Sequence, residues 1–146
     1  MARWLCILDH PVEGTNNSHS AQIILPNKQT GHSSDIYISV QSAELQVAPK
    51  GRWIAMISAQ VYTANPRREL LSAYKLLGGV LKDFFSVHDT FEATNEKVAD
   101  NVFIPSSMDA STHFEQTTKE VMAIYKAITG QEVDLEADPN TINDDQ

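Results

Sequence analysis

DNVFIPSSMDASTHFEQTTKEVMAIYKAITG, the stretch from Asp100 to Gly130, decides the fold that this sequence predicts. Its first part, Val102–Pro105, is typical of a short buried strand, and a turn follows. Behind the turn one side of a helix is predicted from side chains that recur at three- and four-residue steps: Phe114, Thr118, Val121, Tyr125 and Ile128. Gly130 supplies the left-handed residue that commonly ends a helix. A strand that leads into a well-defined helix is half of a βαβ unit.

The start of this helix carries the main candidate site of the sequence. Thr112 and Glu115 form a T-x-x-E capping box, in which each side chain accepts a hydrogen bond from a backbone N–H. Asp109, Ser111, Thr112 and His113 could instead hold an anion such as phosphate, because N–H groups point outward at a helix start. The capping interpretation is favoured, since Asp109 would repel an anion and already interacts with the positive end of the helix dipole.

The chain before this stretch predicts a largely antiparallel sheet. Short apolar runs bounded by turn residues, and alternating apolar and polar residues, are typical of strands. Strands are therefore expected at Trp4–Leu8, Ala21–Leu25, Asp35–Ser42 and Trp53–Val61. In the last of these, alternate residues from Trp53 form one face and alternate residues from Ile54 the other. Short loops and the turn Pro49–Arg52 join these segments, which favours antiparallel pairing.

A helix is predicted after the fourth strand. Asn65 is a favourable cap and Pro66 suits the first helical position. A stripe follows at Leu70, Tyr74, Leu77 and Leu81, although Gly78-Gly79 can end the helix early. Asp83–Asp89 is expected to be a further strand, and Phe91–Ala99 a polar connection. The fold class predicted is thus mixed α/β, or α+β, with a C-terminal strand–helix unit.

Charge divides the chain into a body and a tail. Six of the nineteen acidic residues lie in the tail, residues 131–146, which has no Lys or Arg. The body, residues 1–130, then has thirteen acids and eleven bases, although the whole chain has a net charge of −8. We expect the tail to be flexible and solvated. No basic patch with interleaved aromatic residues supports nucleic-acid binding, and no apolar run is long enough for a membrane span.

The motifs of common catalytic and metal sites are missing from the sequence. The five histidines are scattered, and no pair of them has ligand spacing with Cys or carboxylates. The sequence has no G-x-S-x-G elbow, P-loop or dinucleotide fingerprint. Cys6 lies within an apolar run, so a buried and inert thiol is expected. No metal or cofactor is predicted.

Blocks along nearly the whole chain, from Cys6–Leu8 near its start to Asp134–Glu136 near its end, resemble Rab GDP dissociation inhibitors. The run Asp109–Thr117 closely resembles the C-terminal helix region of that family, and the other blocks occur in the family's order. They are Cys6–Leu8, His10-Pro11, Gln22–Pro26, Ser34–Tyr37, Lys50-Gly51, Trp53–Ala55, Pro66–Leu77, Ile124–Lys126, Thr129-Gly130 and Asp134–Glu136. Rab escort proteins share the fold but fit these blocks less well.

The resemblance implies a cytoplasmic binding protein that is not an enzyme. Members hold GDP-bound, geranylgeranylated Rab GTPases, associate with membranes only transiently, and recycle Rabs in vesicle-mediated protein transport. Their large domain has an FAD/NAD(P)-binding-like fold, and residues 1–130 would be its C-terminal part. The family's Rab-binding and lipid-binding motifs lie upstream of the segment that this chain resembles. The chain therefore inherits no Rab or lipid site from the resemblance, and we expect it to act mainly as scaffold.

Two alternatives remain. An autonomous interaction module could use exposed sheet edges or the acidic tail, and exposed edges would allow the isolated chain to self-associate. A fragment of a flavin enzyme is the third hypothesis. In flavoproteins of this architecture a Gly precedes the Asp at the start of the final helix, so that the backbone can approach the cofactor. Met108 occupies that position here, which argues against a flavin.

Overall fold

The computed structural model describes residues 1–106, 110 and 114–136. These residues form two compact units. Of the described residues, the first unit comprises 1–90 and 110, and the second comprises 91–106 and 114–136. Each unit is described by itself.

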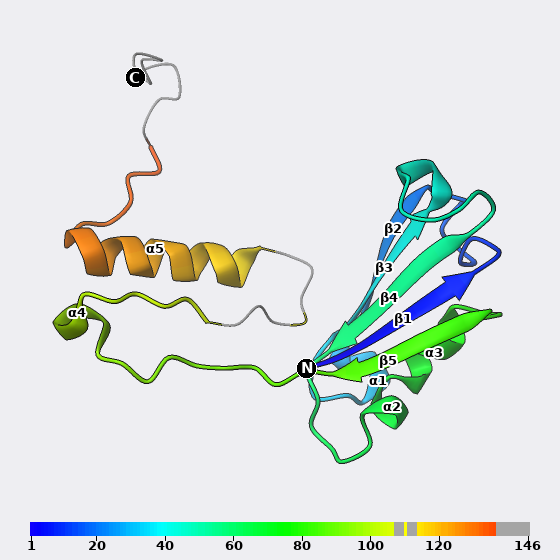
Figure 1. The fold of residues 1–146 in the computed structure, drawn as a ribbon, viewed down its shortest axis with the longest axis horizontal. Coiled ribbons are helices and arrows are strands. Elements are labelled where there is room, and N and C mark those ends of the chain that lie inside the picture. The colour runs from blue at the N-terminus through cyan, green and yellow to red at the C-terminus, as the bar shows by residue number, and fades with distance from the viewer. Residues whose placement is uncertain (107–109, 111–113, 137–146) are drawn as a thin grey trace. The chain divides into compact units, whose positions relative to one another are not determined.

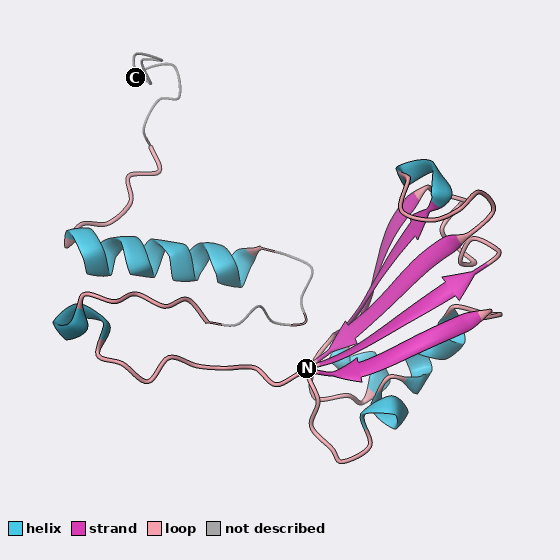
Figure 2. Ribbon diagram, viewed as in Figure 1, coloured by secondary structure: helices cyan, strands magenta, loops and turns pink. Residues whose placement is uncertain are grey.

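A five-stranded sheet builds the first unit. Its strands are β1 (Ala2–Leu8), β2 (Ser20–Leu25), β3 (Ile36–Ser42), β4 (Trp53–Ala59) and β5 (Lys82–Val87). They lie in the order β2-β3-β4-β1-β5, and every neighbouring pair is antiparallel (Figure 2). The predicted antiparallel sheet is confirmed, and all five strands overlap their predicted segments. The chain's first strand, β1, lies inside the sheet between β4 and β5.

Short helical segments connect these strands. They are α1 (Asn27–Thr30), the 3₁₀ turn η1 (Ala43–Leu45), α2 (Pro66–Glu69) and α3 (Leu71–Leu76). The single helix predicted after Asn65 is interrupted at Leu70, whose backbone angles of φ −92° and ψ 4° depart from helical values. Gly78, at φ +76°, follows the helical region as predicted. Leu81 lies beyond it and donates its N–H to Ile7 O at 2.9 Å, so it does not belong to the helical stripe.

The core lies between one face of the sheet and α2–α3 (Figure 1). Alternate residues of the three inner strands supply it, and Leu70, Ala73 and Leu77 supply the helical side. Of the large side chains, Leu8, Ile36, Ile38 and Ile57 have no exposed surface. Side chains on a strand alternate between faces, so the strict alternation of burial along β1 and β3 follows from their sequences.

The second unit contains α4 (Lys97–Asp100) and α5 (Glu115–Thr129). The helix predicted behind the quoted turn is confirmed, and it ends at Gly130 with φ +74°. The strand predicted over Val102–Pro105 is wrong, because these residues have no regular secondary structure. A strand needs a neighbour to pair with, and no described strand pairs with this segment. The short helix α4 also interrupts the predicted polar connection.

Candidate functional site

The cluster that the sequence singles out, Asp109, Ser111, Thr112 and His113, lies outside the described residues. So does the Thr112 half of the predicted capping box. Among the described neighbours, Phe114 is the residue before the helix, and Glu115 begins it with a 2.5 Å contact to Lys119 Nζ. The capping and anion-binding interpretations of this cluster therefore both stay predictions.

Glu69, at the end of α2, is the most highly connected carboxylate among the described residues. Its Oε1 accepts hydrogen bonds from Thr63 N at 2.8 Å and Thr63 Oγ1 at 2.5 Å. Its Oε2 accepts one from Tyr62 N at 3.1 Å and lies 2.9 Å from His32 Nε2. The Glu69 side chain is only 10% exposed. One carboxylate thus holds the connection after β4 and the loop after α1 in place.

These contacts decide the charge state of Glu69. Burial alone would raise its pKa, but the hydrogen bonds from Thr63, His32 and Tyr62 outweigh burial and lower the pKa. His32 Nδ1 lies 2.7 Å from Ser34 O, and the His32 ring meets the Tyr62 ring edge-on at 5.5 Å. The carboxylate is therefore ionised at neutral pH and fully used within the fold.

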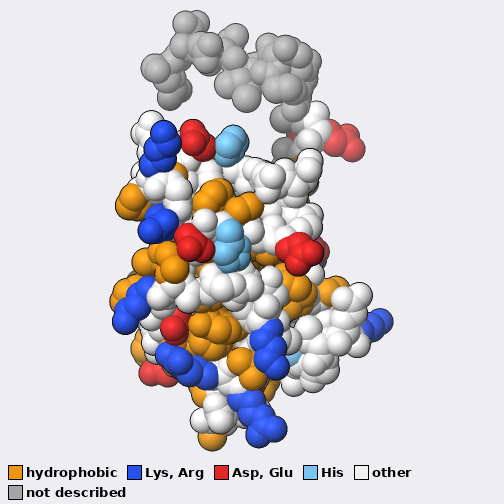
Figure 3. Space-filling view, turned by 90° about the vertical axis from the view of Figure 1, so that its right-hand side faces the viewer, with side chains coloured by type: hydrophobic (Ala, Val, Ile, Leu, Met, Phe, Trp, Pro, Cys, Tyr) orange, Lys and Arg blue, Asp and Glu red, His pale blue; other side chains and the backbone are white. Residues whose placement is uncertain are grey.

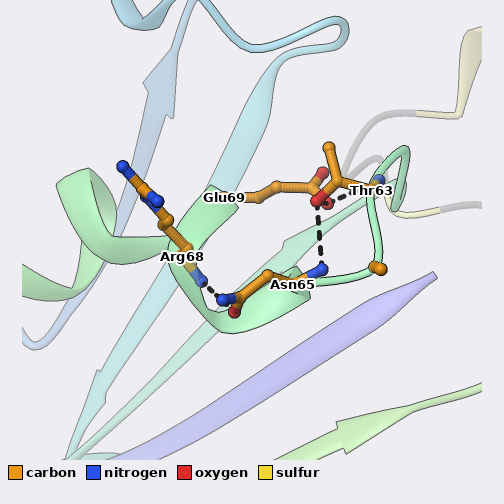
Figure 4. Close-up of a pocket in the computed structure, with 5 residues that line it drawn as sticks. Thr63, Asn65, Arg68 and Glu69 are labelled. Carbon is orange, nitrogen blue, oxygen red and sulfur yellow. Dashed lines mark hydrogen bonds between the residues drawn. The ribbon is translucent and has the colours of Figure 1, made fainter.

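A hollow of about 490 Å³ lies beside this carboxylate (Figure 4). It is lined by Thr63, Ala64, Asn65, Arg68 and Glu69. Asn65 Oδ1 accepts from Arg68 N at 3.4 Å, and Asn65 N donates to Thr63 Oγ1 at 3.2 Å. This confirms the predicted cap at Asn65. Thr63, Asn65 and Glu69 use their polar groups within this wall, whereas the Arg68 side chain is directed away from them (Figure 4). We therefore interpret the hollow as an open turn surface.

An aromatic stack joins α2–α3 to the sheet. Trp4 lies parallel to Tyr74 with ring centroids 4.1 Å apart and meets Phe85 edge-on at 5.3 Å. The Arg67 guanidinium lies 5.1 Å from the Trp4 ring centroid, which is cation–π geometry. Trp4 Nε1 donates to Asp83 Oδ2 at 2.7 Å. Asp83 Oδ2 also accepts from Arg67 Nη2 at 3.5 Å, so one carboxylate holds both nitrogens within the stack, and we interpret the stack as structural.

His10 fastens the end of α3 to the end of β1. Its Nδ1 lies 2.9 Å from Pro11 O, and its Nε2 lies 3.0 Å from Gly79 O. The bond to Pro11 O raises the pKa of His10, and the bond to Gly79 O adds to that rise against the lowering effect of burial. A Cβ on Gly78 would come within 3.2 Å of His10 Cε1. His10 therefore has a structural role at the junction of β1 and α3, which the sequence pattern around the His10-Pro11 block does not indicate.

The described part of the chain offers neither a cluster of metal ligands nor an exposed thiol. No group of three or more His, Cys, Asp or Glu side chains there could hold a metal ion. Cys6 is fully buried, and burial, with a smaller effect of Asp83, raises its thiol pKa to about 12. The prediction of a buried, inert thiol is confirmed. None of the described helices has the length and apolar character to cross a membrane.

Comparison with known proteins identifies the class of the chain. Residues 1–140 match the model of the GDP dissociation inhibitor family. Guanosine nucleotide diphosphate dissociation inhibitor 1 of Arabidopsis thaliana is 46% identical over 140 residues, which are 96% of this chain and 32% of that protein. The Rab GDP-dissociation inhibitor of Saccharomyces cerevisiae is 42% identical over 128 residues, 88% of this chain and 28% of that protein.

A solved structure agrees with the sequence comparisons. The crystal structure of a Rab GDI from Plasmodium falciparum matches with a TM-score of 0.84 and 40% identity, over 91% of this chain and 30% of that one. The chain belongs to the GDP dissociation inhibitor family, as its sequence blocks predict. It spans about a third of the length of the relatives that it matches.

Proposed function

We propose that this chain is a scaffold segment of a Rab GDP dissociation inhibitor. The complete protein would bind GDP-bound, geranylgeranylated Rab GTPases and recycle them between membranes and the cytoplasm during vesicle-mediated transport. The family match over residues 1–140 carries this proposal. The names of the relatives support its direction, because they describe Rab GDP dissociation inhibitors and, in Schizosaccharomyces pombe, a probable secretory pathway GDP dissociation inhibitor.

The scaffold role is supported by how the polar groups of the described residues are used. Glu69, His10 and Asp83 all bond within the first unit, and the hollow beside Glu69 is lined by a single turn. The family name describes a regulator of nucleotide release, and no bond-making chemistry follows from it. We therefore assign no catalytic role and no cofactor to these residues.

We further propose that residues 1–130 form the C-terminal part of a larger domain with a flavoprotein-like fold, followed by the acidic tail 131–146. The second unit supports this placement. None of the residues of α5 is buried, and its stripe residues Phe114, Val121 and Ile128 are 74%, 59% and 59% exposed. An amphipathic helix gains stability mainly by burying its apolar face, so α5 needs a surface that the described residues of its own unit do not supply.

A chimera tests the functional proposal. The matching third of the Arabidopsis thaliana inhibitor is replaced by this chain, and extraction of prenylated, GDP-loaded Rab from lipid vesicles is measured. We expect extraction close to that of the intact relative, with a chimera lacking the matching third as the negative control. A folded chimera that extracts no Rab would overturn the proposal.

Binding by the chain alone tests the scaffold assignment. We expect no tight binding between the isolated 146-residue chain and prenylated, GDP-loaded Rab in a pull-down, whereas tight binding would refute the scaffold role. The rival function, an independent interaction module, is favoured by the core that the first unit closes by itself. That rival gains support if the chain is monomeric in sedimentation and unfolds in one cooperative step.

A further inference from the structure

The two faces of the sheet are covered very differently. On one face, Trp4, Cys6, Ile38 and Ile57 are buried beneath α2–α3 or by their neighbours. The side chains on the other face alternate with these along the strands. Its apolar members are half-buried or exposed, and we call them the open face: Leu5, Ile7, Ile54, Met56 and Phe84.

The members of the open face form one continuous surface across three strands. Leu5 lies opposite Met56 on one side and Phe84 on the other, and Ile7 lies opposite Ile54. Residues opposite each other on antiparallel strands have their side chains in contact range on the same face. A hollow of about 230 Å³ is lined here by Leu5, Met56 and Phe84 together with Arg3, Phe85 and Ser86. Phe84, on the edge strand β5, is 55% exposed, so a large apolar ring of this surface faces solvent.

The charges on this face have one sign. Arg3 and Lys82 lie on the same side as Leu5 and Phe84, and Lys82 Nζ is 5.9 Å from the Phe84 ring centroid. Every strand residue on this side is apolar, polar and uncharged, or basic. Yet the chain as a whole has a net charge of −8. Seen from the side in Figure 3, the molecule shows hydrophobic side chains among basic, acidic and His side chains. The open face therefore complements an apolar surface with acidic groups around it.

The far end of the same side is already covered by later sequence. Ser58 lies opposite Arg3 in the β1–β4 register, and its Oγ donates to Ala110 O at 2.9 Å. Ser58 and Ala110 are 9% and 8% exposed, so the Ser58 position is covered, whereas Arg3 opposite it remains exposed. Burial thus changes within two residues along β4, from Ser58 to the half-buried Met56. The side chains of the open face, from Met56 onward, are suited to a covering layer that the described residues of the first unit do not supply.

We propose that the open face is the docking surface for the remaining two thirds of a family-length polypeptide, which presents apolar side chains and at least one carboxylate to Arg3. The relatives extend to about three times the length of this chain, so sequence of sufficient size exists in the family. A second copy of this chain is a poor occupant. A two-fold pairing of open faces would bring Arg3 and Lys82 toward the same basic residues of the partner. This inference rests on the family assignment and not on Rab binding.

Assembly of two separate polypeptides tests the proposal. The full 146-residue chain is mixed with the Arabidopsis thaliana inhibitor from which the matching third has been deleted, and binding is followed by calorimetry without Rab. Phe84→Glu places a carboxylate on the open face, and Leu76→Glu is the matched control. Leu76 lies on α3, next to Leu77, which packs on the opposite face of the sheet, and it is 44% exposed. We expect Phe84→Glu to weaken assembly by about tenfold or more and Leu76→Glu to change it little.

Charge reversal provides a second, independent variant pair. Arg3→Glu is expected to weaken assembly several-fold, and raised salt should weaken assembly of the wild-type chain, because screening reduces attraction between exposed charges. Lys75→Glu, an exposed position on α3, controls for the change in net charge. Circular dichroism checks that each variant is folded, and Phe84 and Arg3 are exposed enough for the fold to tolerate the change.

Three results would overturn the proposal. The first is absence of assembly by the wild-type chain, and the second is equal loss with the open-face and α3 variants. The third is sedimentation of the chain alone as a dimer that Phe84→Glu dissociates, which would assign the face to a second copy. Assembly without Rab extraction would instead leave this proposal standing and count against the proposed function.

Discussion

The first and second units of the chain use their apolar residues in opposite ways. In the first, strands and helices bury large side chains completely, as at Leu8, Ile38 and Leu70, which are at most 1% exposed. In the second, α5 has a clear apolar stripe, yet none of its residues is buried. In both units the spacing of the apolar residues fits the local secondary structure. The difference shows that periodicity determines where a helix forms, whereas a core also requires an opposing surface.

The largest expected difference between the units concerns a buried and an exposed isoleucine. Ile57→Ala removes a side chain with no exposed surface and leaves a cavity, and we expect a loss of about 2–5 kcal/mol in the free energy of unfolding. Ile128→Ala removes the same atoms from a side chain that is 59% exposed, and we expect a change within about 0.5 kcal/mol. Urea unfolding measures both. Similar losses would show that α5 packs into a core of the isolated chain.

A carboxylate in each unit, Glu69 in the first and Glu120 in the second, is expected to contribute differently to stability. Glu69→Gln removes a charge that accepts four hydrogen bonds within the first unit, and a loss of about 1.5–3 kcal/mol is expected. Glu120 of the second unit also accepts from a backbone N–H, Ser106 N at 2.7 Å, but it is only half-buried and this hydrogen bond is open to solvent, so Glu120→Gln should have a much smaller effect. Equal effects of the two substitutions would contradict the assignment of Glu69 as a structural hub.

The same pair predicts a difference in acid. The folded-state pKa of Glu69 is lowered, so its contribution is complete above the ordinary glutamate pKa of 4.5 and is lost as the pH falls through the lowered value. Stability measured between neutral pH and about pH 3 should therefore fall less steeply in Glu69→Gln than in the wild-type chain. Parallel curves for the two proteins would remove Glu69 as the cause.

Two glycines give the smallest expected effect. Gly78 and Gly130 have φ of +76° and +74°, so alanine at either position adopts a left-handed conformation that costs about 1–2 kcal/mol. At Gly78 the new Cβ also lies 3.2 Å from His10, whereas at Gly130 nothing lies within 4 Å. Gly78→Ala should therefore destabilise the chain more than Gly130→Ala in thermal unfolding. A Gly78→Ala, His10→Ala double variant that removes this excess would identify the contact as its cause.

Sequence patterns predicted the first unit well because its signals are local. Alternation in Asp35–Ser42 and the Asn65-Pro66 cap each specify a structure within a few residues, and both are confirmed. The hub at Glu69 was missed because its partners, His32 and Thr63, carry no common motif and meet only through the fold. Glu69 lies within the Pro66–Leu77 block that resembles the family, and this resemblance is the only sequence feature that points to it.

The second unit was predicted less well for the opposite reason. Val102–Pro105 has the composition of a buried strand, but a strand forms only against a neighbour, and none of the described strands reaches it. Val102 and Ile104 are accordingly 49% and 48% exposed. The sequence of Val102–Pro105 suits a buried segment, but the described residues leave it about half exposed. The candidate cluster from Asp109 to His113 stays a prediction.

The place of β1 inside the sheet also constrains the order in which the protein folds during synthesis. Its neighbours are far along the chain, since Ala2 lies opposite Ala59 on one side and Val87 on the other. β1 therefore gains its second neighbour only when β5, which begins at Lys82, has been synthesised, and contacts of such long sequence separation form slowly. β4 can pair with one edge of β1 earlier, but until β5 follows, the other edge of this apolar strand has no partner. An unpaired strand edge of this kind is a site at which a partly synthesised chain can aggregate.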